Sequence, residues 1–171
     1  MAANSLLKIV SGGQTGVDRS GLDVAIFLGL EHGGWCPAGR RSEDGRIPKR
    51  YQLTETNARD YTVRTEQNVI DSDATLILYR RQMSGGTQLT YRLTKKHRRL
   101  ALALDIDAMD DVVDDSIGEA GRQLLAWIQD NQIGVLNVAG PRESTSPGIG
   151  KQAEMFLVQT LQTVFGELAE N

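Results

Sequence analysis

Cysteine is the scarcest residue in this chain of 171 residues and occurs once, as Cys36. A lone thiol excludes an internal disulfide, a cysteine-rich zinc site and an iron–sulfur cluster, because each of these needs more than one thiolate. A chain of this length buries about 70% of its unfolded surface, so a hydrophobic core can stabilise it without covalent cross-links. We therefore expect one globular domain spanning residues 1–171 in a reducing compartment.

Long apolar runs are also missing. No segment approaches the roughly 18 apolar residues of a membrane span, and the first eight residues lack the basic start and apolar stretch of a signal peptide. The formal net charge is only −3, so bulk electrostatics do not recruit nucleic acid. These absences predict a cytoplasmic protein with no membrane or nucleic-acid partner.

Catalytic and metal-binding signatures are absent as well. The two histidines, His32 and His97, do not have the spacing of metal ligands, and no Gly-x-Ser-x-Gly motif is present. Glu43, Asp44, Glu55 and Glu66 are candidate general acids or bases, but their spacing implies no pairwise geometry. The pattern favours a binding protein over an enzyme and leaves catalysis open.

Short apolar runs alternate with helical patterns along the chain. The runs expected as strands are residues 6–10, 31–35, 74–79, 100–104 and 135–139. The helical patterns are residues 16–28, one or two short helices within 51–69, then 87–97, 119–130 and a last helix that includes Ala153 and Leu168. This alternation predicts an α/β fold, a three-layer sandwich with a mostly parallel sheet of about five or more strands.

Six aspartates lie within residues 105–115. Their spacing lacks the glycine and the terminal glutamate of a calcium-binding loop. We interpret this segment as a solvated linker and predict no metal site.

Three loops follow predicted strands and lead into predicted helices: residues 11–16, 84–87 and 141–150. The carboxyl ends of parallel strands meet at one edge of a sheet, so these loops are expected to converge. Unpaired N–H groups at a helix start favour an anion, and glycine permits close backbone approach. The loops therefore predict a phosphorylated ligand.

The candidate ligand-binding residues lie in these loops and in the polar segment 36–49. They are Gly12, Gly13, Gln14, Thr15, Gly16, Asp18, Arg19, Arg40, Glu43, Asp44, Ser84, Gly85, Gly86, Thr87, Pro147 and Gly148. Guanidinium groups suit a phosphate, and carboxylates suit the N–H groups of a heterocycle. Asp18 has the alternative role of complementing a helix dipole. A bulky residue at Gly13, or Thr87→Val, is expected to weaken ligand binding while leaving thermal stability nearly unchanged.

Several motifs resemble the molybdenum cofactor carrier family, a branch of the lysine-decarboxylase-like, Rossmann-type nucleotide binders. They are Ser11-Gly12-Gly13-Gln14-Thr15-Gly16-Val17-Asp18-Arg19, Gly34-Trp35-Cys36-Pro37, Glu43-Asp44-Gly45, Arg64-Thr65, Gly85-Gly86-Thr87 and Asn137-Val138-Ala139-Gly140-Pro141-Arg142-Glu143-Ser144. The resemblance runs from about residue 8 to residue 160. It implies a single-domain Rossmann-like homo-oligomer that binds the molybdenum cofactor without covalent attachment, protects it and passes it to molybdoenzymes.

Two alternatives remain open. Phosphoribohydrolases of related fold carry a Gly-Gly-x-Gly-Thr-x-x-Glu loop with a catalytic glutamate, but Thr90 stands where that glutamate would fall. Glu43 or Asp44 is the candidate substitute. A nucleotide-sensing module without catalysis or cargo fits the same loops.

Overall fold

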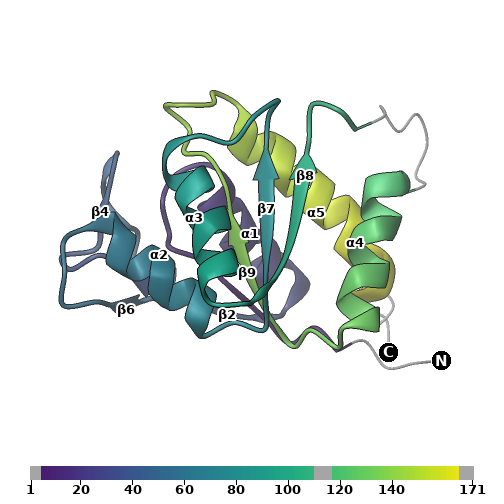
Figure 1. Ribbon diagram of the computed structural model, residues 1–171, viewed down its shortest axis with the longest axis horizontal. Coiled ribbons are helices and arrows are strands. Elements are labelled where there is room, and N and C mark those ends of the chain that lie inside the picture. The colour runs from purple at the N-terminus through teal and green to yellow at the C-terminus, as the bar shows by residue number, and fades with distance from the viewer. Residues whose placement is uncertain (1–4, 110–116, 166–171) are drawn as a thin grey trace.

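The computed structural model describes residues 5–109 and 117–165. Its centre is a five-stranded sheet in which every neighbouring pair is parallel (Figure 1). Across the sheet the strands are β2 (Glu31–Gly33), β1 (Lys8–Val10), β9 (Val135–Ala139), β7 (Ala74–Tyr79) and β8 (Leu100–Asp105). The predicted α/β, Rossmann-like sandwich is confirmed.

Helices cover both faces of the sheet (Figure 1). On one face, α1 (Val17–Leu28) packs against α5 (Ile149–Phe165), which also contacts α4 (Glu119–Asp130). On the other, α2 (Tyr61–Ile70) packs against α3 (Gly85–Lys96). Because both faces are covered, the central strands are apolar on both sides, and five of the six residues of β7 are buried.

The main core lies between the sheet and the α1–α4–α5 face. It joins Leu76 and Leu136 of the sheet to Val24, Leu124 and Leu157 of the three helices, all fully buried. The apolar positions at three- and four-residue intervals that predicted these helices are the positions that fill this core. None of the helices in the described ranges is long and apolar enough to cross a membrane.

The expected strand at residues 31–35 is two strands. The chain breaks at Gly34, and β3 (Trp35–Cys36) pairs with β6 (Thr54–Glu55) in a separate two-stranded sheet. Gly34 has φ +120°, and a Cβ there would lie 2.3 Å from the carbonyl oxygen of Ser11. This close approach requires glycine and turns the chain out of the main sheet.

Two other expectations need refinement. The polar segment 36–49 was expected to be a loop, but it contains a hairpin of β4 (Arg41–Ser42) and β5 (Gly45–Arg46). Between residues 51 and 69 there is one helix, which starts where the Asp60 carboxylate accepts a hydrogen bond from the Thr62 N–H. Leu168 and much of the acidic segment, residues 110–116, lie outside the described residues.

The strand order has a simple description when counting starts at β9. Taken in the sequence β9, β1, β2, β7, β8, the strands lie in the sheet as 3-2-1-4-5, the order of a doubly wound fold. Ligands of such folds bind where the order reverses, at the carboxyl ends of the first and fourth strands. Here these strands are β9 and β7, so the topology identifies the edge at which to look for a site.

Candidate functional site

A cavity of about 400 Å³, here called the rim cavity, lies at this edge. Its walls come from residues within the ranges 14–18, 60–65, 84–90 and 139–145. The loops after β1, β7 and β9 therefore meet, as the sequence predicted, and α2 closes one side. Gln14, Asp18 and all four candidates from Ser84 to Thr87 line the cavity.

The start of α3 is open to a ligand. Ser84, the residue before the helix, makes no side-chain cap, and its carbonyl oxygen accepts the N–H groups of Thr87 and Gln88. The N–H groups of Gly85 and Gly86 belong to the turn that has no intrahelical acceptor. A Cβ at either glycine would meet no described atom within 4 Å. Both the donors and the space for an anion are present here.

The start of α1 is closed. The Val17 N–H donates to the carbonyl oxygen of Pro141 at 3.3 Å. The Gln14 N–H donates to Asp18 Oδ2 at 3.3 Å, and the Thr15 N–H donates to Gln14 Oε1 at 3.1 Å. The N–H groups of Gln14, Thr15 and Val17 are therefore paired with the protein's own acceptors.

The start of α5 is closed by an internal anion. The Glu143 carboxylate accepts the N–H groups of Gly148 and, at 3.2 Å, of Gly150. The carbonyl oxygen of Pro147 accepts a 2.7 Å hydrogen bond from Arg80 Nη1. The candidates Pro147 and Gly148 thus take part in loop packing and do not line the rim cavity.

An ion pair lies in the wall between α1 and α2. Arg64 Nη1 is 3.1 Å from Asp18 Oδ2, and the two side chains are only 13% and 5% exposed. A Cβ at Gly12 would come within 1.8 Å of Arg64 Nη1, so Gly12 leaves room for this guanidinium. Burial raises the pKa of Asp18 against the opposing effect of the Arg64 charge.

Arg64 was not among the candidate ligand-binding residues, although it lines the rim cavity. Its Nε and the Nε2 of Gln14 are buried and have no hydrogen-bond partner in the described chain. A buried donor without an acceptor costs about 1–3 kcal/mol of folding free energy, and a ligand that supplies an acceptor would remove this cost. In the sequence, only the Arg64-Thr65 motif pointed to this residue. Arg64 is far from the first glycine loop along the chain, and folding brings α2 beside that loop.

Positive charge gathers around Tyr61 at the side of the cavity. The guanidinium carbons of Arg41, Arg64 and Arg142 lie 5.8, 5.9 and 5.6 Å from the centre of its ring. Cation–π contacts at this range hold the guanidinium groups near the ring face. The arrangement favours an anionic ligand with an aromatic part.

Arg19, Glu43 and Asp44 are engaged outside the cavity wall. Arg19 forms a bidentate pair with Asp44 at 2.6 and 2.8 Å, and these hydrogen bonds lower the pKa of Asp44. Glu43 accepts the hydroxyls of Thr15 and Ser144, and so clamps the first loop to the loop after β9. Burial raises the pKa of Glu43, but these hydrogen bonds outweigh burial and hold that pKa below its usual range.

Arg40 is buried in the loop that precedes α2. Its guanidinium donates to the carbonyl oxygens of Ile47, Pro48 and Tyr51 at 3.1, 2.9 and 2.8 Å. Arg40 is 9% exposed and does not line the rim cavity. These contacts give it a place in the packing of the loop.

Gly13 gives a prediction about stability. It has φ +74°, and a Cβ there would lie 2.5 Å from Leu53 Cδ1 and 3.0 Å from Ile47 Cδ1. The expectation that a bulky residue leaves stability unchanged is therefore wrong for Gly13, because strain and overpacking act together. We expect Gly13→Val to lower the free energy of unfolding by about 3 kcal/mol. Denaturant titration measures this loss, and a variant as stable as the parent would contradict the packing described.

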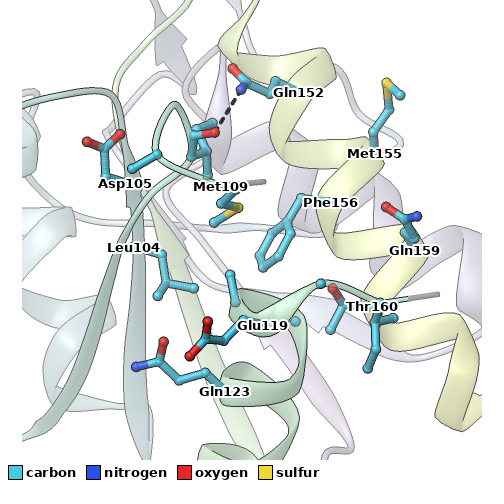
Figure 2. A pocket seen from close by; sticks show the side chains of 16 residues that line it. Leu104, Asp105, Met109, Glu119, Gln123, Gln152, Met155, Phe156, Gln159 and Thr160 are labelled. Carbon is cyan, nitrogen blue, oxygen red and sulfur yellow. Dashed lines mark hydrogen bonds between the residues drawn. The ribbon is translucent and has the colours of Figure 1, made fainter. Parts of the chain in front are cut away.

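A second cavity, of about 440 Å³, lies between the end of β8, the start of α4 and the middle of α5 (Figure 2). Apolar side chains such as Met109 and Phe156 and amides such as Gln159 line it. None of its described lining residues carries a positive charge, whereas Asp105 and Glu119 are acidic. This cavity is unsuited to an anion.

Comparisons with known proteins agree with the fold. The model of the family described as "Circularly permutated YpsA SLOG family" matches residues 9–161. The crystal structure of a protein from Syntrophus aciditrophicus SB, named "putative molybdenum carrier protein", superposes with a TM-score of 0.83. That protein is 39% identical, and the match covers 95% of this chain and 96% of that chain. A search of the curated proteins finds no match.

The family description also accounts for the strand order, since a circular permutation moves the first strand of a doubly wound sheet to the end of the chain. β9 is that strand here. The resemblance to the molybdenum carrier family is confirmed. The match spans most of the chain, and the protein belongs to the circularly permutated YpsA SLOG family.

Proposed function

We propose that this protein binds the molybdenum cofactor without covalent attachment in the rim cavity and delivers it to molybdoenzymes. The observation that carries the proposal is the uncapped start of α3, which opens into a cavity at the switch point of the sheet. The 39% identical relative named a molybdenum carrier supports the same ligand class.

The residues of the cavity suit this ligand. The cofactor is a reduced pterin with a dithiolene-bound molybdenum centre and a terminal phosphate, so it needs an anion cradle and partners for a polar ring. The N–H groups of Gly85 and Gly86 supply the cradle. The guanidinium groups beside Tyr61 suit a second anionic group, and Asp18 offers an acceptor. A volume of about 400 Å³ lies within the ordinary range of ligand sites.

The contacts of Glu43 and Asp44, the candidate substitutes for the missing glutamate, favour binding over base release from nucleotides. A general acid or base must reach the substrate. Glu43 is held by Thr15 and Ser144, and Asp44 by Arg19, and neither lines the cavity. The Thr90 hydroxyl donates to the carbonyl oxygen of Gly86. A carrier needs no such group, because it stabilises the ligand itself rather than a transition state.

The test is retention and transfer of the cofactor. Protein incubated anaerobically with the molybdenum cofactor is expected to co-elute with it in gel filtration and then to activate a cofactor-free molybdoenzyme. A soluble protein of similar size and charge serves as the control. Retention no greater than that of the control would contradict the proposal, and release of free base from nucleoside monophosphates would favour the hydrolase alternative.

A further inference from the structure

One carboxylate oxygen of Asp18 has no hydrogen-bond partner among the described residues. Oδ2 accepts hydrogen bonds from the Gln14 N–H at 3.3 Å and from Arg64 Nη1 at 3.1 Å. Oδ1 has no hydrogen bond with any residue in the described ranges. Because each carboxylate oxygen has about two acceptor positions, both positions on Oδ1 are available.

Oδ1 is an unpaired acceptor on a largely buried side chain. Asp18 is 4% exposed and lines the rim cavity. Because Asp18 lines the rim cavity, we take its unpaired Oδ1 to be reachable from the cavity. Burial raises the pKa of Asp18, whereas the Arg64 charge opposes that change, so N–H donors from a ligand would further stabilise the ionised form. An acceptor in such a site discriminates strongly between donors and other acceptors.

We propose that Asp18 selects the heterocycle of the ligand: Oδ1 accepts hydrogen bonds from two adjacent N–H donors, as on the 2-amino-4-oxo edge that pterins and guanine share. The inference rests on the proposed function to the extent that the rim cavity is taken as the ligand site. The phosphate of the same ligand lies at the start of α3, where no described residue accepts the N–H groups of Gly85 and Gly86.

Three nucleotides with the same ribose phosphate separate the ring edge from the anion. Guanosine monophosphate presents a ring N–H and an amino group side by side, and inosine monophosphate keeps only the ring N–H. Adenosine monophosphate places a ring nitrogen acceptor beside its amino group, and this acceptor repels a carboxylate. A site that depends on Oδ1 therefore ranks the three in the order guanosine, inosine, adenosine.

Isothermal titration calorimetry of the purified protein with each nucleotide tests the ranking. We expect guanosine monophosphate to bind at least about tenfold more tightly than adenosine monophosphate, since hydrogen bonds to charged groups are the stronger ones. Equal affinities for the three nucleotides would overturn the inference, and so would no detectable binding of guanosine monophosphate at millimolar concentration.

Variants locate the effect. In Asp18→Asn the preference for guanosine over adenosine monophosphate is expected to fall to about twofold or less, because the amide presents a donor and a weaker acceptor. Asp60→Asn is the matched control: Asp60 is another carboxylate of the same cavity, and asparagine also caps a helix, so the preference is expected to persist. A preference that survives in Asp18→Asn would overturn the assignment to this residue.

Phosphate binding by the variant and nucleotide ranking by the parent protein are measured alongside. Asp18→Asn removes a negative charge from the cavity and leaves the start of α3 unchanged, so inorganic phosphate is expected to bind the variant no more weakly than the parent. If the variant does not fold, the ranking by the parent protein still decides the inference. A protein that ranks the nucleotides as expected but does not retain the molybdenum cofactor would contradict the proposed function alone, whereas retention without ranking would contradict this inference alone.

Discussion

Gly86→Val is expected to weaken the binding of inorganic phosphate and of the molybdenum cofactor by about 100-fold or more. A Cβ at Gly86 meets no described atom within 4 Å, and the residue has no positive φ, so valine fits the folded chain without strain. The new methyl groups would occupy the space in front of the free N–H groups at the start of α3. A lost anion site of this kind costs several charge-assisted hydrogen bonds at once.

The same change leaves stability almost untouched. Valine is a slightly better helix former than glycine, so the free energy of unfolding is expected to stay within about 1 kcal/mol of the parent. Gln88→Val is the matched control, because Gln88 is exposed on the same helix and does not line the rim cavity. Calorimetric titration gives the affinity and scanning calorimetry the stability. Undiminished phosphate binding by Gly86→Val would place the anion elsewhere in the protein.

Arg40→Met is expected to lower the free energy of unfolding by about 3 kcal/mol. The guanidinium donates to four backbone carbonyl oxygens inside a buried loop, those of Ile47, Pro48, Tyr51 and, at 3.5 Å, Leu53. Methionine fills much of the volume but leaves these acceptors unpaired, and unpaired buried acceptors are costly. For a chain of this size, such a loss lowers the melting temperature by about 6–12 °C.

Affinity measured well below the melting temperature separates packing from ligand binding. Arg40→Met is expected to keep phosphate affinity within about threefold, because Arg40 does not line the rim cavity. Arg46→Met is the control, since Arg46 is an exposed arginine of the same loop, and we expect it to change stability by less than about 0.5 kcal/mol. A large loss of affinity at unchanged stability would instead assign Arg40 to the ligand, as the sequence pattern predicted.

The regular elements of the central layer could be predicted from the sequence because their signals are local. A buried apolar run such as residues 74–79 forms a strand, and the three- and four-residue spacing in α1, α4 and α5 forms helices, whichever segments pack against them. The break at Gly34 had only a weak local signal, the two adjacent glycines Gly33 and Gly34 within the expected strand. It depends on the approach of the Ser11 carbonyl oxygen, which comes from another strand.

The candidate site also has a part that the sequence predicts and a part that depends on tertiary contacts. Glycine loops after alternate strands predicted that three helix starts converge, since parallel strands place their carboxyl ends on one edge. All three loops carry the same kinds of residue, so their composition does not distinguish a free helix start from an occupied one. The amides near α1 are paired with Asp18 and Gln14, and those of α5 with Glu143.

The amino-acid sequence by itself therefore determined the α/β class, the family and the edge at which the three loops meet. Only the tertiary structure decided which helix start stays open, and it brought Arg64 of α2 against Asp18 of α1, 46 residues apart. The physical reason is that the supply of hydrogen-bond acceptors at a helix start depends on neighbours from distant segments. Of α1, α3 and α5, only α3 begins without an acceptor from a distant segment among the described residues.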